Sequence, residues 1–100
     1  MNVDELVGGE TGTYRVHTRD SHYIFNLDGG TGTVQRFAGA ASNPSPNDEL
    51  RRIRFIRECR AGARGYWEMY PGPSDAPVEF MWQHTSEIRS IERMDDNANR

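Results

Sequence analysis

Aromatic and aliphatic side chains occupy every second position in two segments near the start of the chain, residues 14–18 and 23–27. An alternation of period two, rich in aromatic and β-branched residues, predicts β-strands with one buried face. The dipeptide Asp20-Ser21 between them suits a tight turn, so we predict a hairpin. A two-residue turn there fixes the register. The predicted facing pairs are Tyr14 with Leu27, Val16 with Phe25, and Thr18 with Tyr23.

Three glycines in residues 28–32 predict a second turn, followed by a short strand at residues 34–37. A phosphate-binding loop is the alternative for such a run, but that loop must open a helix, and the residues that follow favour a strand. We therefore predict a hairpin turn. Residues 38–49 then form a loop that is long for a compact domain. Loops of this length are often functional or disordered, and the sequence leaves both open.

Residues 50–60 carry two competing patterns. Apolar side chains recur at every third position from Leu50 to Cys59, and the flanking residues resemble the start and stop of a helix. The β-branched and aromatic residues of the same segment favour a strand. We predict a strand, joined by a turn at residues 61–63 to a further strand at residues 65–70.

The remaining segments are short. Two prolines and a glycine in residues 71–75 predict a turn, and alternation predicts a strand at residues 78–83. Apolar residues at three-residue spacing in residues 87–94 fit either one helical turn or a strand with a bulge. Residues 1–11 are predicted to be a loose lead-in with little to bury, and residues 95–100 a polar tail.

Together these segments predict a single mainly β domain at residues 12–94. Its five to seven short strands would form a small antiparallel barrel or rolled sheet. A chain of 100 residues fits one such domain. The predicted core residues are Tyr14, Val16, Phe25, Leu27, Val34, Ile53, Phe55, Trp67, Met69, Phe80, Trp82, Ile88 and Ile91.

The composition is that of a globular protein, with 35% hydrophobic residues, 27% charged residues and a net charge of −3. This balance alone favours neither nucleic acid nor an anionic membrane as a partner. No apolar stretch is long enough to cross a bilayer or to form the core of a signal peptide. The single cysteine, Cys59, cannot form an internal disulfide. We expect a cytoplasmic protein, or a virion protein assembled in the cytoplasm.

All twelve basic residues are arginines, and six of them lie in residues 51–64 against a single glutamate, a local charge of +5. The aromatic residues that follow can stack on bases or on guanidinium groups. Two interpretations stay open: a surface that binds nucleic acid or another anion, or a solvated face whose arginines pair with the acidic ends of the chain. The candidate interaction residues are Arg52, Arg54, Arg57, Arg64, Tyr66 and Tyr70.

Three histidines and one cysteine raise metal and catalytic alternatives. His17 and His22 would be diagonal neighbours in the predicted hairpin, close enough to bind one ion, but zinc usually needs three or four protein ligands. A catalytic pair of Cys59 and His84 has no known nucleophile motif around it. A lone cysteine on an apolar strand is usually a small buried side chain. We therefore expect no metal, no cofactor and no catalytic site.

Several segments stand out together: Gly12-Thr13-Tyr14-Arg15-Val16, Thr18, Tyr23-Ile24-Phe25-Asn26-Leu27-Asp28 and Val34-Gln35-Arg36, and later Trp82, Thr85, Ile88 and Ile91-Glu92. They resemble small uncharacterised proteins of actinobacteria and their phages. The resemblance implies a compact β-barrel similar to SH3-like or Sm-like barrels, with a strand at residues 51–59, and it implies no activity. The absence of lysine indicates a GC-rich genome, which agrees with such a source.

The sequence thus favours a non-enzymatic protein-interaction module, such as a phage-encoded or accessory subunit of a larger assembly. Strand edges and loops of small barrels suit binding, and aromatic side chains suit a surface that packs against protein. We expect a protein partner or self-association, and no small-molecule substrate. The alternative is a nucleic-acid-binding protein that uses residues 51–64.

Overall fold

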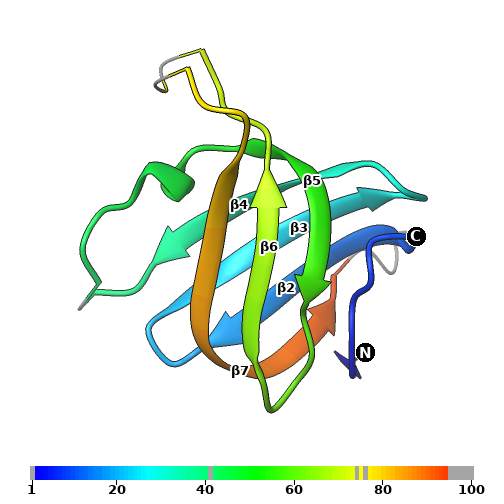
Figure 1. Ribbon diagram of the computed structural model, residues 1–100. Helices are drawn as coiled ribbons and strands as arrows, with labels where there is room; N and C mark the ends of the chain where they lie inside the picture. Colours follow the sequence, from blue (N-terminus) through cyan, green and yellow to red (C-terminus); the bar gives the residue numbers. More distant parts are fainter. Residues whose placement is uncertain (1, 41, 74, 76, 95–100) are drawn as a thin grey trace.

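A computed structural model describes residues 2–40, 42–73, 75 and 77–94. Within these residues the strands are β1 (Asn2–Val3), β2 (Thr11–Thr18), β3 (Ser21–Asp28), β4 (Gly32–Ala38), β5 (Arg51–Glu58), β6 (Arg64–Met69) and β7 (Met81–Arg93), with a 3-10 helix η1 (Pro46–Asp48). All neighbouring strands are antiparallel, in the order β1-β7-β2-β3-β4-β5-β6. A further pairing of β6 with β7 closes the sheet into a ring (Figure 1). The predicted small barrel or rolled sheet is confirmed.

The hairpin of β2 and β3 is confirmed, but its predicted register is wrong. Tyr14 pairs with Phe25 and Val16 pairs with Tyr23. The turn is therefore Arg19-Asp20, one residue earlier than predicted. This difference moves every pair by two residues, so it leaves the same side chains on the buried face. The glycine-rich turn between β3 and β4 is also confirmed.

Strand β5 explains why its apolar residues recur at every third position. Its register against β6 shifts twice, between Ile53 and Phe55 and between Ile56 and Glu58. Each bulge inserts one residue, so the inward positions come three apart instead of two. Ile53, Ile56 and Cys59 therefore all pack toward the core. The predicted strand is confirmed, but Phe55 is not a core residue, because 37% of it is exposed.

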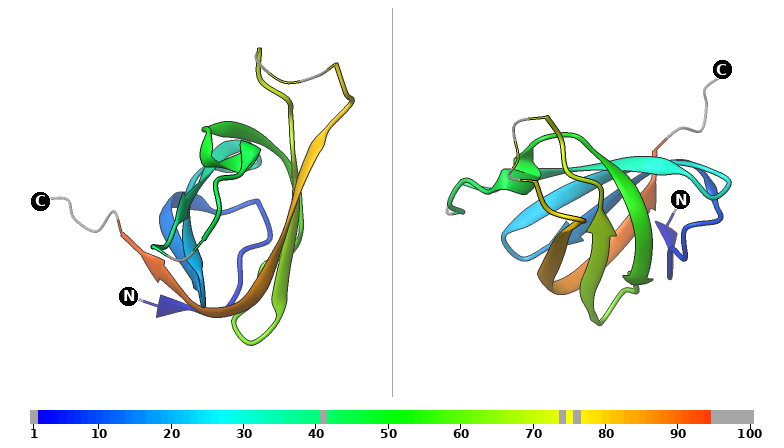
Figure 2. Two further views of the ribbon diagram at one scale, coloured as in Figure 1. Left: turned by 90° about the vertical axis from the view of Figure 1, so that its left-hand side faces the viewer. Right: turned by 45° about the horizontal axis from the view of Figure 1, so that its top comes forward.

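Strand β7 is one continuous strand of 13 residues, where the sequence predicted two elements. Its first half pairs with β6 and its second half with β2, so it curves from one layer of the barrel to the other (Figure 2). A register shift opposite His17 and Thr18 confirms the bulge alternative for residues 87–94. The core prediction is wrong at Trp82, which is 58% exposed, and Phe80 is only half-buried.

The N-terminal segment is not the loose lead-in that was predicted. Strand β1 pairs with the end of β7, and Leu6 is only 1% exposed. The Leu6 N–H donates to the carbonyl of Cys59 at 2.9 Å, which holds the segment against the end of β5. The predicted tail at residues 95–100 lies outside the described residues.

The loop between β4 and β5 forms one turn of helix. Ser45 caps η1 through a capping box with Asp48, so the helix-start signal of the sequence is real, but the chain turns into β5 after three helical residues. Asp48 also receives an ion pair from Arg36 at 2.7 Å and, at its carbonyl, a hydrogen bond from Gln35 at 2.9 Å. These bonds hold the described part of the loop against β4.

Trp67 lies at the centre of the core. It is fully buried, and its ring makes edge contacts with Tyr23 and Phe25, with ring centroids 5.1 and 4.9 Å apart. The other buried apolar side chains surround it: Leu6, Tyr14, Val16, Leu27, Val34, Cys59, Met69, Ile88 and Ile91. Among the described residues, no helix is long and apolar enough to cross a membrane.

Candidate functional site

The outward side of β5, β6 and the start of β7 gathers arginine and aromatic side chains. Three of its aromatic residues are well exposed: Trp82 at 58%, Tyr70 at 40% and Phe55 at 37%. Such exposure of large rings is uncommon on a small soluble domain when the rings lie together. We call this surface the arginine–aromatic face. It consists of Arg52, Arg54, Phe55, Arg57, Tyr66, Tyr70, Phe80 and Trp82.

Local backbone geometry explains why these side chains share one side. In β6 the alternation is regular, so Trp67 and Met69 point inward while Tyr66 and Tyr70 point outward. In β5 the two bulges direct most of the residues between the apolar positions outward. The bulges therefore decide the composition of the face.

The arginines lie over the aromatic rings. Arg52 lies 4.9 Å from the ring centroid of Tyr70, and Arg57 lies 5.9 Å from that of Tyr66. Arg54 lies 5.2 Å from the ring of Phe80. Contacts of this kind hold a guanidinium against a ring without neutralising its charge.

Glu68 lies beneath the middle of the face and is only 6% exposed. Its carboxylate accepts a hydrogen bond from Arg54 at 2.6 Å and one from the Tyr66 hydroxyl at 3.2 Å. Loss of hydration at Tyr66, followed by this contact with Glu68, raises the pKa of the phenol. The carboxylate thus offsets the charge of Arg54 and fixes the Tyr66 hydroxyl.

The structure brings together five of the six predicted interaction residues. Arg64 is directed toward β7 instead, where its Nε donates to the carbonyl of Thr85 at 2.9 Å. The sequence missed Phe55, Phe80 and Trp82, which were assigned to the core. Their exposure depends on where β5 bulges and where β7 begins, and local alternation carries no signal for either.

Some of the charge of the arginines in residues 51–64 is paired within the domain, and the partners seen among the described residues are not those of the acidic ends. Arg51 pairs with Asp75, and Arg60 lies 3.0 Å from Glu58. These partners, like Glu68, come from β5, β6 and the turn after β6. The face consequently presents less positive charge than the sequence count of +5 suggests.

The histidines and the cysteine lie in three separate places: His17 with His22, His84 beside Tyr66, and Cys59 in the core. His17 and His22 lie directly opposite each other, with ring centroids 6.1 Å apart, and His22 stacks on Phe37. Burial, followed by the charge of Arg15, lowers the pKa of His22. Within the described residues, no three or more potential metal ligands cluster.

Cys59 and His84 do not share an environment. Cys59 is buried in the core, where burial raises the pKa of its thiol to about 12. His84 is exposed, and its ring packs edge-on against Tyr66 with centroids 5.9 Å apart. Cys59 therefore packs as a small apolar side chain.

Comparisons with protein-family models, with curated proteins and with solved structures find no match for this chain.

Proposed function

We propose that the chain is a non-enzymatic protein-interaction module that binds a protein partner through the arginine–aromatic face. The observation that carries this proposal is the grouping of exposed Trp82, Tyr70 and Phe55 with three arginines on one sheet surface. Tryptophan, tyrosine and arginine dominate the energetically important positions of protein interfaces. Their rings supply apolar area at low cost in side-chain entropy.

The chemistry of the face defines the partner. Apolar side chains of the partner pack against the exposed rings, and carboxylates pair with Arg52 and Arg57, which lie over rings at the surface. The partner is therefore a protein surface that combines acidic and apolar side chains. A subunit of a larger assembly fits this description, and a second copy of the chain is the simplest case to test.

Two exposed phenylalanines provide a matched pair of variants. Phe55 lies on the face and is 37% exposed, whereas Phe37 lies on β4 and is 39% exposed. We expect Phe55→Ala and Trp82→Ala each to weaken partner capture by roughly tenfold or more, as interface aromatics do. Phe37→Ala should leave capture unchanged.

Capture is measured by pull-down from cells that express the chain natively, and self-association by size-exclusion chromatography with light scattering. Capture that is equally strong in all three variants would contradict the proposal. So would a strictly monomeric protein that retains no protein partner.

A second candidate function is binding of nucleic acid, favoured by the guanidinium groups of Arg52 and Arg57 over tyrosine rings. Such rings and guanidinium planes offer places for bases to stack, and the charges contact phosphates. The carboxylate of Glu68 within the face and the net charge of −3 oppose it.

A gel-shift assay with mixed DNA and RNA separates the two functions. Nucleic-acid binding predicts a shift that weakens with salt, with a log–log slope of about −0.9 per phosphate neutralised on duplex DNA. Replacing Arg52, Arg54 and Arg57 with glutamine should flatten this slope. Absence of any shift at about 50 mM salt, where screening is weak, would exclude the second candidate.

A further inference from the structure

Among the described residues, the first half of β7 has a strand neighbour on one edge only. Residues 81–87 pair with β6, whereas β2 pairs with β7 only from Ile88 onward, because the β2–β3 turn ends the hairpin at Arg19-Asp20. The other edge of the first half faces the turn of that hairpin and the loop before η1. An unpaired strand edge is a template for another strand.

The alternation of hydrogen bonds shows which groups lie on this edge. The Tyr70 N–H donates to the carbonyl of Arg52 at 2.9 Å, so the even-numbered residues of β6 direct their main-chain groups toward β5. The odd-numbered residues Trp67 and Met69 direct theirs toward β7. Their partners in β7, Gln83 and Met81, therefore direct their main-chain groups toward β6. The main-chain groups of Trp82 and His84 consequently point away from β6.

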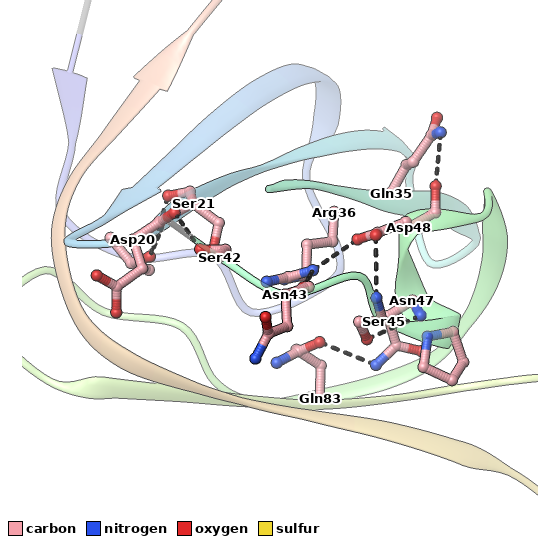
Figure 3. A network of polar contacts seen from close by, with 12 residues as sticks. Asp20, Ser21, Gln35, Arg36, Ser42, Asn43, Ser45, Asn47, Asp48 and Gln83 are labelled. Carbon is pink, nitrogen blue, oxygen red and sulfur yellow. Dashed lines mark hydrogen bonds and ion pairs between the residues drawn. The ribbon is translucent and has the colours of Figure 1, made fainter. Parts of the chain in front are cut away.

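Side-chain amides donate hydrogen bonds to the carbonyls of Trp82 and His84. The Asn47 Nδ2 donates to the carbonyl of Trp82 at 2.9 Å and to the Gln83 Oε1 at 2.9 Å. The Gln83 Nε2 in turn donates to the carbonyl of His84 at 3.1 Å. Figure 3 shows the bridge between Asn47 on η1 and Gln83 on β7. Side-chain amides thus occupy the places that backbone amides of a neighbouring strand would take.

Two cavities lie along this edge, and Gln83 lines both. One has a volume of about 390 Å³ and is lined by polar groups from the β2–β3 turn, the loop and β7, among them Asp20, Asn43 and Thr85. The other has a volume of about 440 Å³ and is lined mainly by apolar side chains, including Pro46 and Val78. Both volumes are in the range of ligand sites, and we call the two cavities, which share Gln83, the groove beside β7.

We propose that an extended segment of the protein partner occupies this groove and adds to β7 as a strand. Its main chain pairs with Trp82 and His84 and displaces the amides of Asn47 and Gln83. The spacing of the main-chain groups that point away from β6 selects a polypeptide, because an extended backbone repeats its donors and acceptors at the same interval. The inference rests on the proposed function and specifies the form of the partner.

The added strand enlarges the sheet that carries the arginine–aromatic face. Every second side chain of the segment then lies on that face beside Trp82, and the others point into the groove. The apolar cavity near Val78 receives an apolar side chain, whereas the polar cavity near Thr85 receives a hydrogen-bonding one. Backbone pairing supplies affinity, and these alternate positions supply specificity.

The probe is a random library of peptides of about 12 residues, long enough to span the edge at about 3.3 Å per residue. Peptides selected on the full chain are resynthesised with N-methyl groups on every second amide, in two alternating sets. We expect one set to lose affinity by roughly tenfold or more, because it removes the pairing N–H groups, and the other set to bind nearly as well as the parent. Equal effects of the two sets, or a library without binders, would overturn the proposal.

A protein variant tests the same edge. His84→Pro removes an N–H that points away from β6, so it leaves the β6–β7 ladder intact, and edge positions tolerate proline. Peptide binding should fall by roughly tenfold or more in His84→Pro and persist in His84→Ala, which keeps the N–H. Binding that is equal in the two variants would count against strand addition.

If His84→Pro fails to fold, hydrogen exchange on the wild-type chain decides. The amides of Trp82 and His84 must become protected when peptide binds, and unchanged exchange there overturns the inference. If N-methylation does not change peptide affinity but binding requires Phe55, strand addition is refuted and the proposed function stays intact. If peptides pair with β7 but Phe55→Ala and Trp82→Ala leave protein capture unchanged, the arginine–aromatic face is refuted as the binding surface instead.

Discussion

Arg51 is the buried member of the arginine-rich segment, with 3% of its surface exposed. Its guanidinium pairs with the Asp75 carboxylate and donates to the carbonyl of Pro46 at 2.8 Å. Asp75 also accepts a hydrogen bond from the Gly72 N–H at 2.6 Å. These contacts tie the turn after β6 to η1, so a residue counted as surface charge in the sequence holds two connections together.

Removing the charge of Asp75 should weaken the fold in a pH-dependent way. The hydrogen bond from Arg51, followed by that from the Gly72 N–H, lowers the pKa of this carboxyl. Its contribution to stability is therefore complete above the unfolded-state pKa of about 3.9 and is lost as the pH falls through the lower folded-state pKa. Asp75→Asn should unfold at lower urea concentration near neutral pH and lose less stability on acidification than the wild type.

Urea titrations at a series of pH values measure both effects. Glu79→Gln, a substitution at an exposed carboxylate, serves as the control and should leave the urea midpoint unchanged. If the stability of the wild type and that of Asp75→Asn depended on pH in the same way, the ion pair between Arg51 and Asp75 would not contribute to the stability of the fold.

The Cys59 thiol should be unreactive in the folded protein. Burial raises its pKa to about 12, so at about pH 8 its thiolate fraction is on the order of a thousandfold below that of an ordinary cysteine. Because the folded-state pKa is raised, the associated stability is complete below the unfolded-state pKa of about 8.5 and declines as the pH rises toward 12. Labelling with a chromogenic disulfide should be slow in buffer and fast in denaturing urea. Equally fast labelling in both would contradict the burial.

At the scale of elements, β7 has another bulge opposite β6, besides the one opposite β2, and there a side-chain hydroxyl accepts a backbone hydrogen bond. Arg64 pairs with Glu87 but Tyr66 pairs with His84, so β7 has one residue too many opposite Gly65. The Gly65 N–H donates to the Oγ1 of the buried residue Thr85 at 2.7 Å, in place of a ladder carbonyl.

Replacing the Thr85 hydroxyl should show how much its hydrogen bond contributes to the free energy of unfolding. Thr85→Val keeps the shape of the side chain but leaves the buried Gly65 N–H without an acceptor, and should lower the free energy of unfolding by about 1–3 kcal/mol. Thr85→Ser retains the hydroxyl and should recover most of the loss. Chemical denaturation of the three proteins measures the difference, and equal loss in both variants would assign the effect to packing instead.

Alternation predicted the strands that contain no bulge and failed where a bulge changes the parity. In β2, β3 and β6 every second residue is buried, as the sequence indicates. In β5 the two bulges turned Phe55 outward, although its apolar character suggests a core position. The sequence therefore predicted the arginine and tyrosine members of the arginine–aromatic face, but it missed Phe55, whose outward position depends on the bulges, and Phe80 and Trp82, whose exposure depends on where β7 begins.

At the scale of the whole molecule, the N-terminal segment closes one end of the barrel. We expect Leu6→Ala to lower the free energy of unfolding by about 2–5 kcal/mol, the usual cost of truncating a buried leucine. Val7→Ala is the matched control, because Val7 is 64% exposed, and should change stability by less than about 0.5 kcal/mol. Similar stability of the two variants would mean that the segment is dispensable.

The sequence could not reveal this closure, because it depends on distant partners. Leu6 lies in a segment without apolar periodicity, between two acidic residues and Val7-Gly8-Gly9, and β1 has only two residues. Both acquire their role only when the far ends of β5 and β7 are placed beside them. Local periodicity predicts strands, but it does not tell which distant strands become neighbours.

The position of β7 in the chain has a consequence for protein synthesis. This strand neighbours β1, β2 and β6, and it contributes Ile88 and Ile91 to the core. While the ribosome still holds residues 81–93, the emerging chain has strands without their partners and aromatic residues without cover. Closure of the barrel is a non-local event that requires β7, so the nascent chain exposes unpaired strand edges until this strand has left the ribosome.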